Sequence, residues 1–197
     1  MKILHVITTM RKAAGTSVFC GEVCNGLVAA GHAVAIAVSS PNDPDLYPTL
    51  QYQGTEKDLV EASAVNFYEG VTAQEVNDFY ARMEDPSDPH PISYGLNSKV
   101  VKENGKVVEK TWKVGGIYGP ALEVIICHLE AAKAVAENDT QQQYIDELIA
   151  YYRSGDLRMW DKYNITWVGD TESDVDFVNG FVEDYDDPLG RKASWEG

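Results

Sequence analysis

The sequence predicts an α+β fold that is mostly helical, with a β-hairpin and a C-terminal strand. Between residues 120 and 155, apolar side chains recur every three or four positions, as in two successive helices. The segment "KVVKENGKVVEK" places two β-branched runs on either side of Asn104-Gly105, a pair typical of a two-residue hairpin turn. Near the end of the chain, the run "DFVNGFVE" favours a strand over a helix because it is rich in β-favouring residues and contains a glycine.

The first 49 residues predict a separate βαβ unit of Rossmann-like type. "KILHVIT" and "HAVAIAVSS" are continuous apolar runs, as expected for buried parallel strands, and the segment between them has helical spacing. The crossover is expected to be right-handed. Cys20 and Cys24 lie one helical turn apart, but no second ligand pair accompanies them, so we interpret them as buried apolar residues. His5 is interpreted as a core residue of the first strand.

Residues 50–54 read as a junction, and residues 55–197 as one α+β domain. "TEKDLVEASAVNFYEGV" predicts a short helix and a turn. Thr72 and Glu75 form a capping box, which predicts a helix that buries Val76, Phe79 and Tyr80. A proline-rich loop, "DPSDPHP", leads to the hairpin.

Three helices are predicted after the hairpin. Proline at position 120 is tolerated in the first turn of a helix, and the expected buried stripe comprises Leu122, Ile125, Ile126, Leu129 and Ala132. Thr140 is the predicted cap of the second helix, which ends near Gly155 and packs antiparallel to the first. Asp156 caps the third, whose Leu157, Trp160 and Tyr163 we interpret as core rather than as a binding platform.

Composition narrows the classes of partner. The formal net charge is −15, with 31 acidic and 16 basic residues, which disfavours nucleic acid and anionic membrane surfaces as partners. Three cysteines are too few for a disulfide framework and indicate a reducing compartment. No apolar run approaches the roughly 20 residues that span a bilayer, and the N-terminus lacks a signal-peptide pattern, so a cytoplasmic protein is predicted.

No complete catalytic constellation is present in the sequence. The four histidines are scattered, and there is no H-E-x-x-H, no G-x-S-x-G elbow and no Walker motif. We therefore predict no catalytic residue and no metal ligand in this chain. By itself, "EDYDD" indicates an acidic surface.

Residues 55–197 nevertheless resemble dipeptidyl-peptidase III, a family of zinc peptidases that remove dipeptides from peptide N-termini. The resemblance lies in "ASAVNFYEGVT", "SYGLNSKVVKENGKVVEKTWKVGGIYGP", "YYRSGDLRMWDKYNITWVGDTES" and "VDFVNGFVEDYDDPLGRKASWEG". The zinc motifs of the family, H-E-x-x-G-H and E-E-x-R-[AK]-[DE], lie beyond the part matched here. The resemblance therefore implies a truncated enzyme, with zinc as the cofactor of the full-length family and none in this chain.

The family also implies substrate-binding residues. "FVEDYDDPLG" matches its pattern F-[IV]-E-x-Y-x-D-P-[FL]-G, found on a strand that lines the substrate cleft. By resemblance, Glu183 holds the ammonium of the peptide N-terminus, and Tyr185 directs its hydroxyl toward the substrate carbonyl. Two residues apart on a strand, they are expected to share one face.

Residues 1–49 resemble the start of a GT-B-fold glycosyltransferase. The matching segments are "MKILHVITTM", "GTSVFCGEVCNGLVAAGH" and "DLYP". The chain departs from that family at Ala13-Ala14, where a glycine pair is usual, and the nucleotide-sugar domain is not in the sequence. We expect no glycosyl transfer.

Three hypotheses of function remain open. The first is a portion of a dipeptidyl-peptidase III that binds short peptides with a free N-terminus and hydrolyses nothing alone. The second is a non-catalytic peptide-binding module, and the third is a glycosyltransferase-like fragment. A gene-model or assembly junction near residues 49–54 would also explain two unlike parts. Part of a two-lobed enzyme would expose interlobe apolar surface, so self-association is expected.

Overall fold

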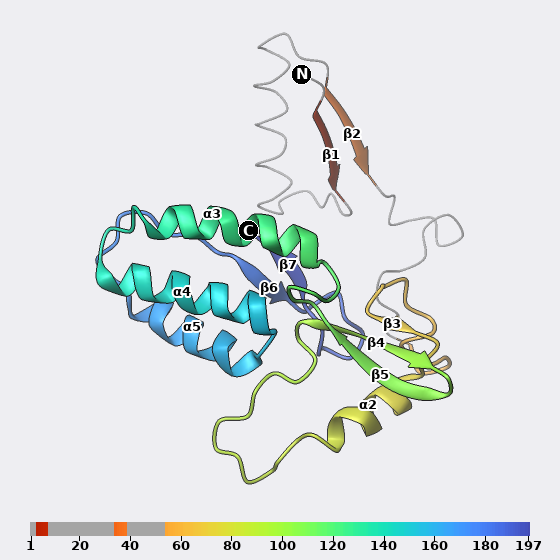
Figure 1. Cartoon of the computed structure of the whole chain (residues 1–197). Helices are drawn as coiled ribbons and strands as arrows, with labels where there is room; N and C mark the ends of the chain where they lie inside the picture. The colour runs from red at the N-terminus through yellow and green to blue at the C-terminus, as the bar shows by residue number, and fades with distance from the viewer. Residues whose placement is uncertain (1–2, 8–33, 39–53) are drawn as a thin grey trace. The chain divides into compact units, whose positions relative to one another are not determined.

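Figure 1 shows the computed structural model of the chain, which describes residues 3–7, 34–38 and 54–197. The chain divides into two units, Met1–Thr49 and Leu50–Gly197. In the first unit, β1 (Ile3–Ile7) and β2 (Val34–Val38) pair in parallel, as two strands of a βαβ unit do. The helix predicted between them lies outside the described residues, as do Cys20 and Cys24, and so does the side chain of His5.

The second unit contains a three-stranded sheet in the order β3-β4-β5. Strand β3 (Tyr68–Glu69) runs parallel to β4 (Ser98–Glu103), which forms the predicted hairpin with β5 (Lys106–Thr111). Asn104 and Gly105 have φ values of 50° and 78°, which a type I′ turn requires, so the hairpin prediction is confirmed.

Helix α2 (Ala73–Ala81) begins at the predicted capping box. The Thr72 hydroxyl accepts a 3.3 Å hydrogen bond from the Glu75 backbone N–H, and the Glu75 carboxylate accepts a 3.0 Å bond from that of Thr72. The short helix predicted just after residue 55 is wrong. There the Asp58 carboxylate accepts backbone N–H groups of Val60 and Ala73, so it holds a turn against the start of α2 instead of leaving those donors to a helix.

Three helices, α3 (Gly119–Lys133), α4 (Asp139–Ser154) and α5 (Leu157–Gly169), lie side by side (Figure 1). Pro120 lies in the first turn of α3, and Gly155 ends α4 with a φ of 72°, both as predicted. The predicted cap of α4 at Thr140 is wrong. Asn138 is the N-cap, because its side-chain oxygen accepts a 2.8 Å bond from the backbone N–H of Gln141.

The helices enclose an aromatic core. The Trp160 ring lies 5.0 Å from that of Tyr151 and 5.2 Å from that of Tyr163, in the range typical of packed aromatic pairs. Asp156 caps α5 as predicted, by accepting a 2.9 Å bond from the backbone N–H of Arg158. Trp160 and Tyr163 are therefore core residues, as we interpreted them.

The C-terminal strand exists but is shorter than its sequence pattern. Strand β6 (Gly180–Glu183) pairs antiparallel with β7 (Ser194–Glu196), and residues 175–179 join no ladder. Phe181 pairs with Trp195 and Glu183 with Ser194, so a β-bulge separates the two pairs. The described residues thus form the α+β fold that was predicted, with helices, a hairpin and a C-terminal strand.

Candidate functional site

The segment "FVEDYDDPLG" forms the end of β6 and the turn between β6 and β7. The buried carboxylate of Asp187 holds this turn in place. Asp187 is 1% exposed. Its Oδ2 accepts 2.8 Å hydrogen bonds from the hydroxyl of Tyr68 and from the backbone N–H groups of Arg191 and Lys192. The carboxylate therefore closes the turn on itself and joins it to strand β3.

A buried amine holds the same turn from the other side. The Nζ of Lys192, fully buried, donates to the Tyr80 hydroxyl at 2.5 Å, to Ser98 Oγ at 2.8 Å and to the Gly95 carbonyl at 3.0 Å. The Tyr80 and Ser98 hydroxyls in turn donate to the Glu109 carboxylate. Burial lowers the pKa of Lys192 to about 8, although Glu109 nearby opposes this effect. These contacts join the turn to α2, β4 and β5.

Glu183 is half-buried at the end of β6, beside a second carboxylate. Hydrogen bonding with Glu196 and desolvation raise the pKa of Glu183, and so do the charges of Glu196, Asp184 and Asp186. Among the lysines and arginines in residues 54–197, none forms an ion pair with any of these four carboxylates. Within residues 54–197, the site is therefore a group of acidic side chains without an ion-paired lysine or arginine.

Tyr185 does not lie on the strand. Strand β6 ends at Glu183, and Tyr185 lies in the following turn with 67% of its side chain exposed. The expectation that the two residues share one face of a strand is therefore wrong, because the turn closed by Asp187 begins before Tyr185. The two side chains are still neighbours. Desolvation and then the charge of Glu183 raise the pKa of Tyr185.

A cavity of about 690 Å³ adjoins this turn. Its lining is largely aromatic and aliphatic, and comes from β6 and β7, the start of α3, and the segments around residues 66 and 112. No pattern in the sequence predicted these residues as a site. The one local signal is the glycine-rich segment "GGIYGP" before α3, in which Tyr118 adopts a left-handed backbone with a φ of 62°.

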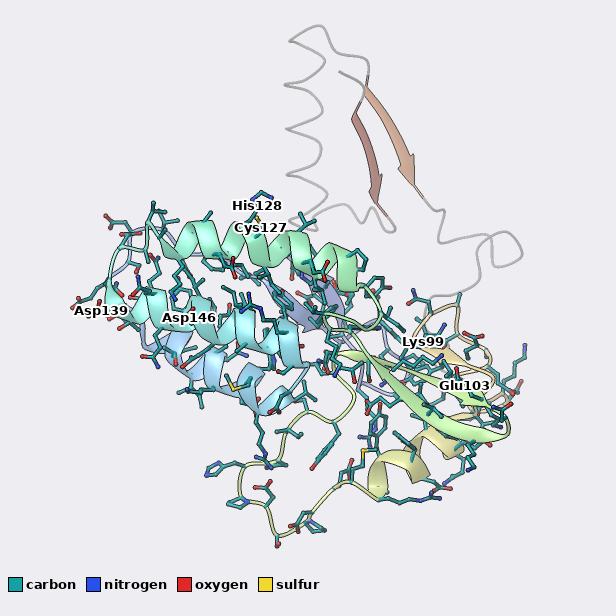
Figure 2. The ribbon with its side chains drawn as sticks, in the orientation of Figure 1. Lys99, Glu103, Cys127, His128, Asp139 and Asp146 are labelled. Carbon is teal, nitrogen blue, oxygen red and sulfur yellow. The ribbon has the colours of Figure 1, made fainter. Side chains whose placement is uncertain are left out.

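The described residues do not fit a zinc site. In the part of the chain that the structure describes, no three histidine, cysteine, aspartate or glutamate side chains lie close enough together to hold a metal ion. Cys127 and His128 stand on the exposed side of α3, and Asp139 and Asp146 lie on α4 (Figure 2). We therefore derive no chemical step through a metal here. In the same described part, no helix is long and apolar enough to cross a membrane.

Comparisons with known proteins point to one family. Residues 66–197 match the model of peptidase family M49. Dipeptidyl peptidase 3 of Rattus norvegicus and that of Homo sapiens are each 33% identical to this chain over 82 residues, or 42% of its length. The matched stretch spans only 11% of the length of each relative.

A solved structure agrees at the level of the fold. The dipeptidyl-peptidase III from Caldithrix abyssi superposes with a TM-score of 0.51 and 19% identity, over 66% of this chain and 24% of that one. The family match starts at residue 66, so it leaves the glycosyltransferase resemblance of residues 1–49 unsupported. Because the family model covers residues 66–197 of a chain of 197, this chain belongs to peptidase family M49.

Proposed function

We propose that this chain carries one wall of the peptide-binding site of a dipeptide-releasing peptidase. In this proposal, Glu183 binds the ammonium of a free peptide N-terminus, and Tyr185 contacts the carbonyl group of the bound peptide. The printed name of the relatives, dipeptidyl peptidase 3, motivates the substrate class.

The observation that carries the proposal is the unpaired acidic group around Glu183. Glu183 and Glu196 lie on the paired strands β6 and β7, and Glu196, Asp184 and Asp186 all raise the pKa of Glu183; among the described residues, no lysine or arginine forms an ion pair with any of the four. Like charges in such proximity destabilise each other, and a bound cation relieves that repulsion. A peptide ammonium supplies the positive charge and also N–H donors for the carboxylate oxygens.

Tyr185 supplies the complementary donor. Its raised pKa keeps the hydroxyl protonated at neutral pH, so it donates a hydrogen bond rather than presenting a phenolate. A donor placed beside the ammonium site suits a peptide carbonyl oxygen and favours any negative charge that develops on it. Its exposure leaves the hydroxyl accessible to a ligand.

Zinc enters the proposal only as the cofactor of the full-length family, where it would supply Lewis-acid chemistry; no described residue of this chain is assigned to it. Because the described residues offer no ligand set, we propose that this chain binds peptides without cleaving them. A dipeptide-release assay on the purified chain, with and without added zinc, is expected to show no turnover above background. Clear zinc-dependent release would contradict this part of the proposal.

The binding part is tested by calorimetric titration with a tetrapeptide and with its N-acetylated form. The free N-terminus is expected to bind at least about tenfold more tightly, because acetylation removes the charge that Glu183 recognises. Glu183→Gln is expected to abolish that difference. Glu123→Gln, an exposed change on α3, is the matched control and is expected to preserve it. Equal binding of both peptides by the unchanged chain would overturn the proposal.

A further inference from the structure

We propose that the aromatic cavity beside the β6–β7 turn is a subsite for a large apolar side chain of the bound peptide. This inference rests on the proposed function, because it concerns the first two residues of the peptide whose ammonium Glu183 holds. It makes the cavity the element that determines which peptides are preferred.

Trp112 forms the centre of the cavity wall. Its ring lies 4.8 Å from that of Phe181, 5.8 Å from that of Tyr118 and 5.9 Å from that of Phe67. All four line the cavity, and so does Trp195, which pairs with Phe181 across the β6–β7 ladder. The volume of about 690 Å³ falls within the range of about 300–1,000 Å³ that is usual for ligand sites with mostly apolar walls.

The backbone at Tyr118 is the second observation. A φ of 62° is easily adopted by glycine or asparagine and is unfavourable for a tyrosine. This strained backbone lies directly before the first residue of α3. The Tyr118 ring packs edge-on against Trp112, and 49% of the residue is exposed. Such strain is common at ligand-binding sites, and here it places a half-exposed aromatic ring on the wall of an open cavity.

The charge of the residues that line the cavity indicates which kind of ligand it favours. Among the described residues that line the cavity, Asp186 is the single charged one and none is cationic. The same carboxylate raises the pKa values of Glu183 and Tyr185, so it lies within electrostatic reach of both. Apolar walls with a negative rim favour a ligand that combines an apolar group with a positive charge, and they disfavour acidic side chains.

The ladder connects the cavity to the ammonium site. Ser194 lines the cavity, pairs with Glu183 across the strands, and donates a 3.3 Å hydrogen bond to the Glu183 carbonyl oxygen. The two subsites are therefore neighbours on one ribbon. A peptide held by its ammonium at Glu183 has the side chains of its first two residues available for the cavity.

The test compares two tetrapeptides, Phe-Phe-Ala-Ala and Ala-Ala-Ala-Ala, by calorimetry. The phenylalanine peptide is expected to bind about tenfold more tightly, since burial of large apolar groups favours binding. Ala121→Trp adds a ring at an exposed cavity-lining position of α3 and is expected to abolish the preference while binding of the alanine peptide persists. Val124→Trp, 60% exposed on the same helix and outside the lining, is the control and is expected to keep the preference.

The variant Tyr118→Gly distinguishes an effect on peptide binding from an effect on the stability of the fold. Glycine relieves the left-handed strain, so the stability of the fold is expected to be nearly retained, whereas loss of the ring reduces the preference for phenylalanine at least threefold.

Each outcome decides between the two proposals. Equal affinity for the two peptides overturns the subsite and leaves the role of Glu183 standing. A phenylalanine preference that is unchanged in Glu183→Gln, together with unchanged affinity, supports an apolar site and overturns the ammonium contact. Absence of binding by both peptides overturns both proposals.

Discussion

The hydroxyl of Tyr68 donates a 2.8 Å hydrogen bond to Oδ2 of Asp187, which lies 119 residues further along the chain. The contact joins strand β3 to the turn that carries Tyr185. Because Asp187 is buried and also accepts backbone N–H groups, we predict that Asp187→Asn lowers the free energy of unfolding by about 1–3 kcal/mol. The asparagine amide would present N–H donors where the carboxylate accepts them.

The measurement is urea unfolding monitored by tryptophan fluorescence. Asp184→Asn is the matched control, because Asp184 is an exposed residue of the same segment. Its effect is expected to stay within about 0.5 kcal/mol, as for other surface substitutions. Equal effects of the two substitutions would show that the turn does not depend on the buried carboxylate.

The buried Lys192 amine predicts an unusual dependence of stability on pH. Its pKa is about 8 in the folded chain and ordinarily 10.5, so between these values the unfolded chain binds more protons than the folded one. Stability is therefore expected to rise as the pH increases above 8. The difference between the two pKa values corresponds to at most about 3 kcal/mol. Above pH 10 the trend reverses, because burial raises the pKa values of Tyr68 and Tyr80 and keeps them protonated in the fold.

The rise is measured by urea unfolding at half-unit steps between pH 7.5 and 10. Lys192→Met retains most of the buried stem and is expected to remove the rise. Lys106→Met changes an exposed lysine of the hairpin and is expected to leave it intact. A rise that persists in Lys192→Met would assign the effect to another group.

The sequence predicted those elements whose signals are local. The capping box of Thr72 and Glu75, the Asn104-Gly105 turn and the caps at Gly155 and Asp156 each depend on residues at most four positions apart. Two errors were also local. Asn138 and Thr140 are both plausible caps two residues apart, and the Asp58 carboxylate took N–H donors that a helix would have used.

The candidate site was predictable only in part because its geometry depends on distant contacts. The family resemblance predicts Glu183 and Tyr185 as substrate contacts, but the Tyr68–Asp187 contact and the buried Lys192 hold the turn in which Tyr185 lies, outside the strand. Likewise, the cavity combines residues 64–67, 112–125 and 181–195. The spacing of apolar residues within one segment cannot predict a cavity whose wall comes from three separate segments.

Gly180, at the start of β6, is predicted to be required for packing. A Cβ atom there would lie 2.3 Å from a ring carbon of Trp160, which is itself buried in the aromatic core. Gly180→Ala is therefore expected to destabilise the fold by about 1–3 kcal/mol, because the ring must shift against its neighbours. Gly169→Ala is the control. Its Cβ meets nothing within 4 Å and it ends α5, so the change is expected to stabilise the fold by up to about 1 kcal/mol.

Thermal unfolding of both glycine variants by circular dichroism is sufficient to compare them. An unchanged midpoint for Gly180→Ala would mean that the Trp160 ring moves freely, which would contradict the packing of β6 against α5.

The acidic group predicts how peptide binding depends on pH. In the free chain, hydrogen bonding with Glu196, desolvation and neighbouring negative charges hold the pKa of Glu183 above its ordinary value of 4.5. A bound ammonium favours the carboxylate and therefore lowers the pKa in the complex. Affinity is thus fully present above the pKa of the free chain, and it falls as the pH decreases through that value. On the alkaline side, affinity falls again above about pH 8, where the peptide α-amino group loses its proton.

Calorimetric titration of a tetrapeptide between pH 4 and 9 is therefore expected to give a bell-shaped profile of affinity. On the acid limb, affinity decreases by up to about tenfold per pH unit, the limit for uptake of one proton. Glu196→Gln removes the like-charged partner, so its acid limb is expected to move to lower pH, whereas Glu183→Gln is expected to lack both the limb and most of the affinity. The alkaline limb belongs to the peptide and stays in place in Glu196→Gln. If the acid limb of Glu196→Gln coincided with that of the unchanged chain, the two carboxylates would not act as one site, and the ammonium would have to be held by Glu183 alone.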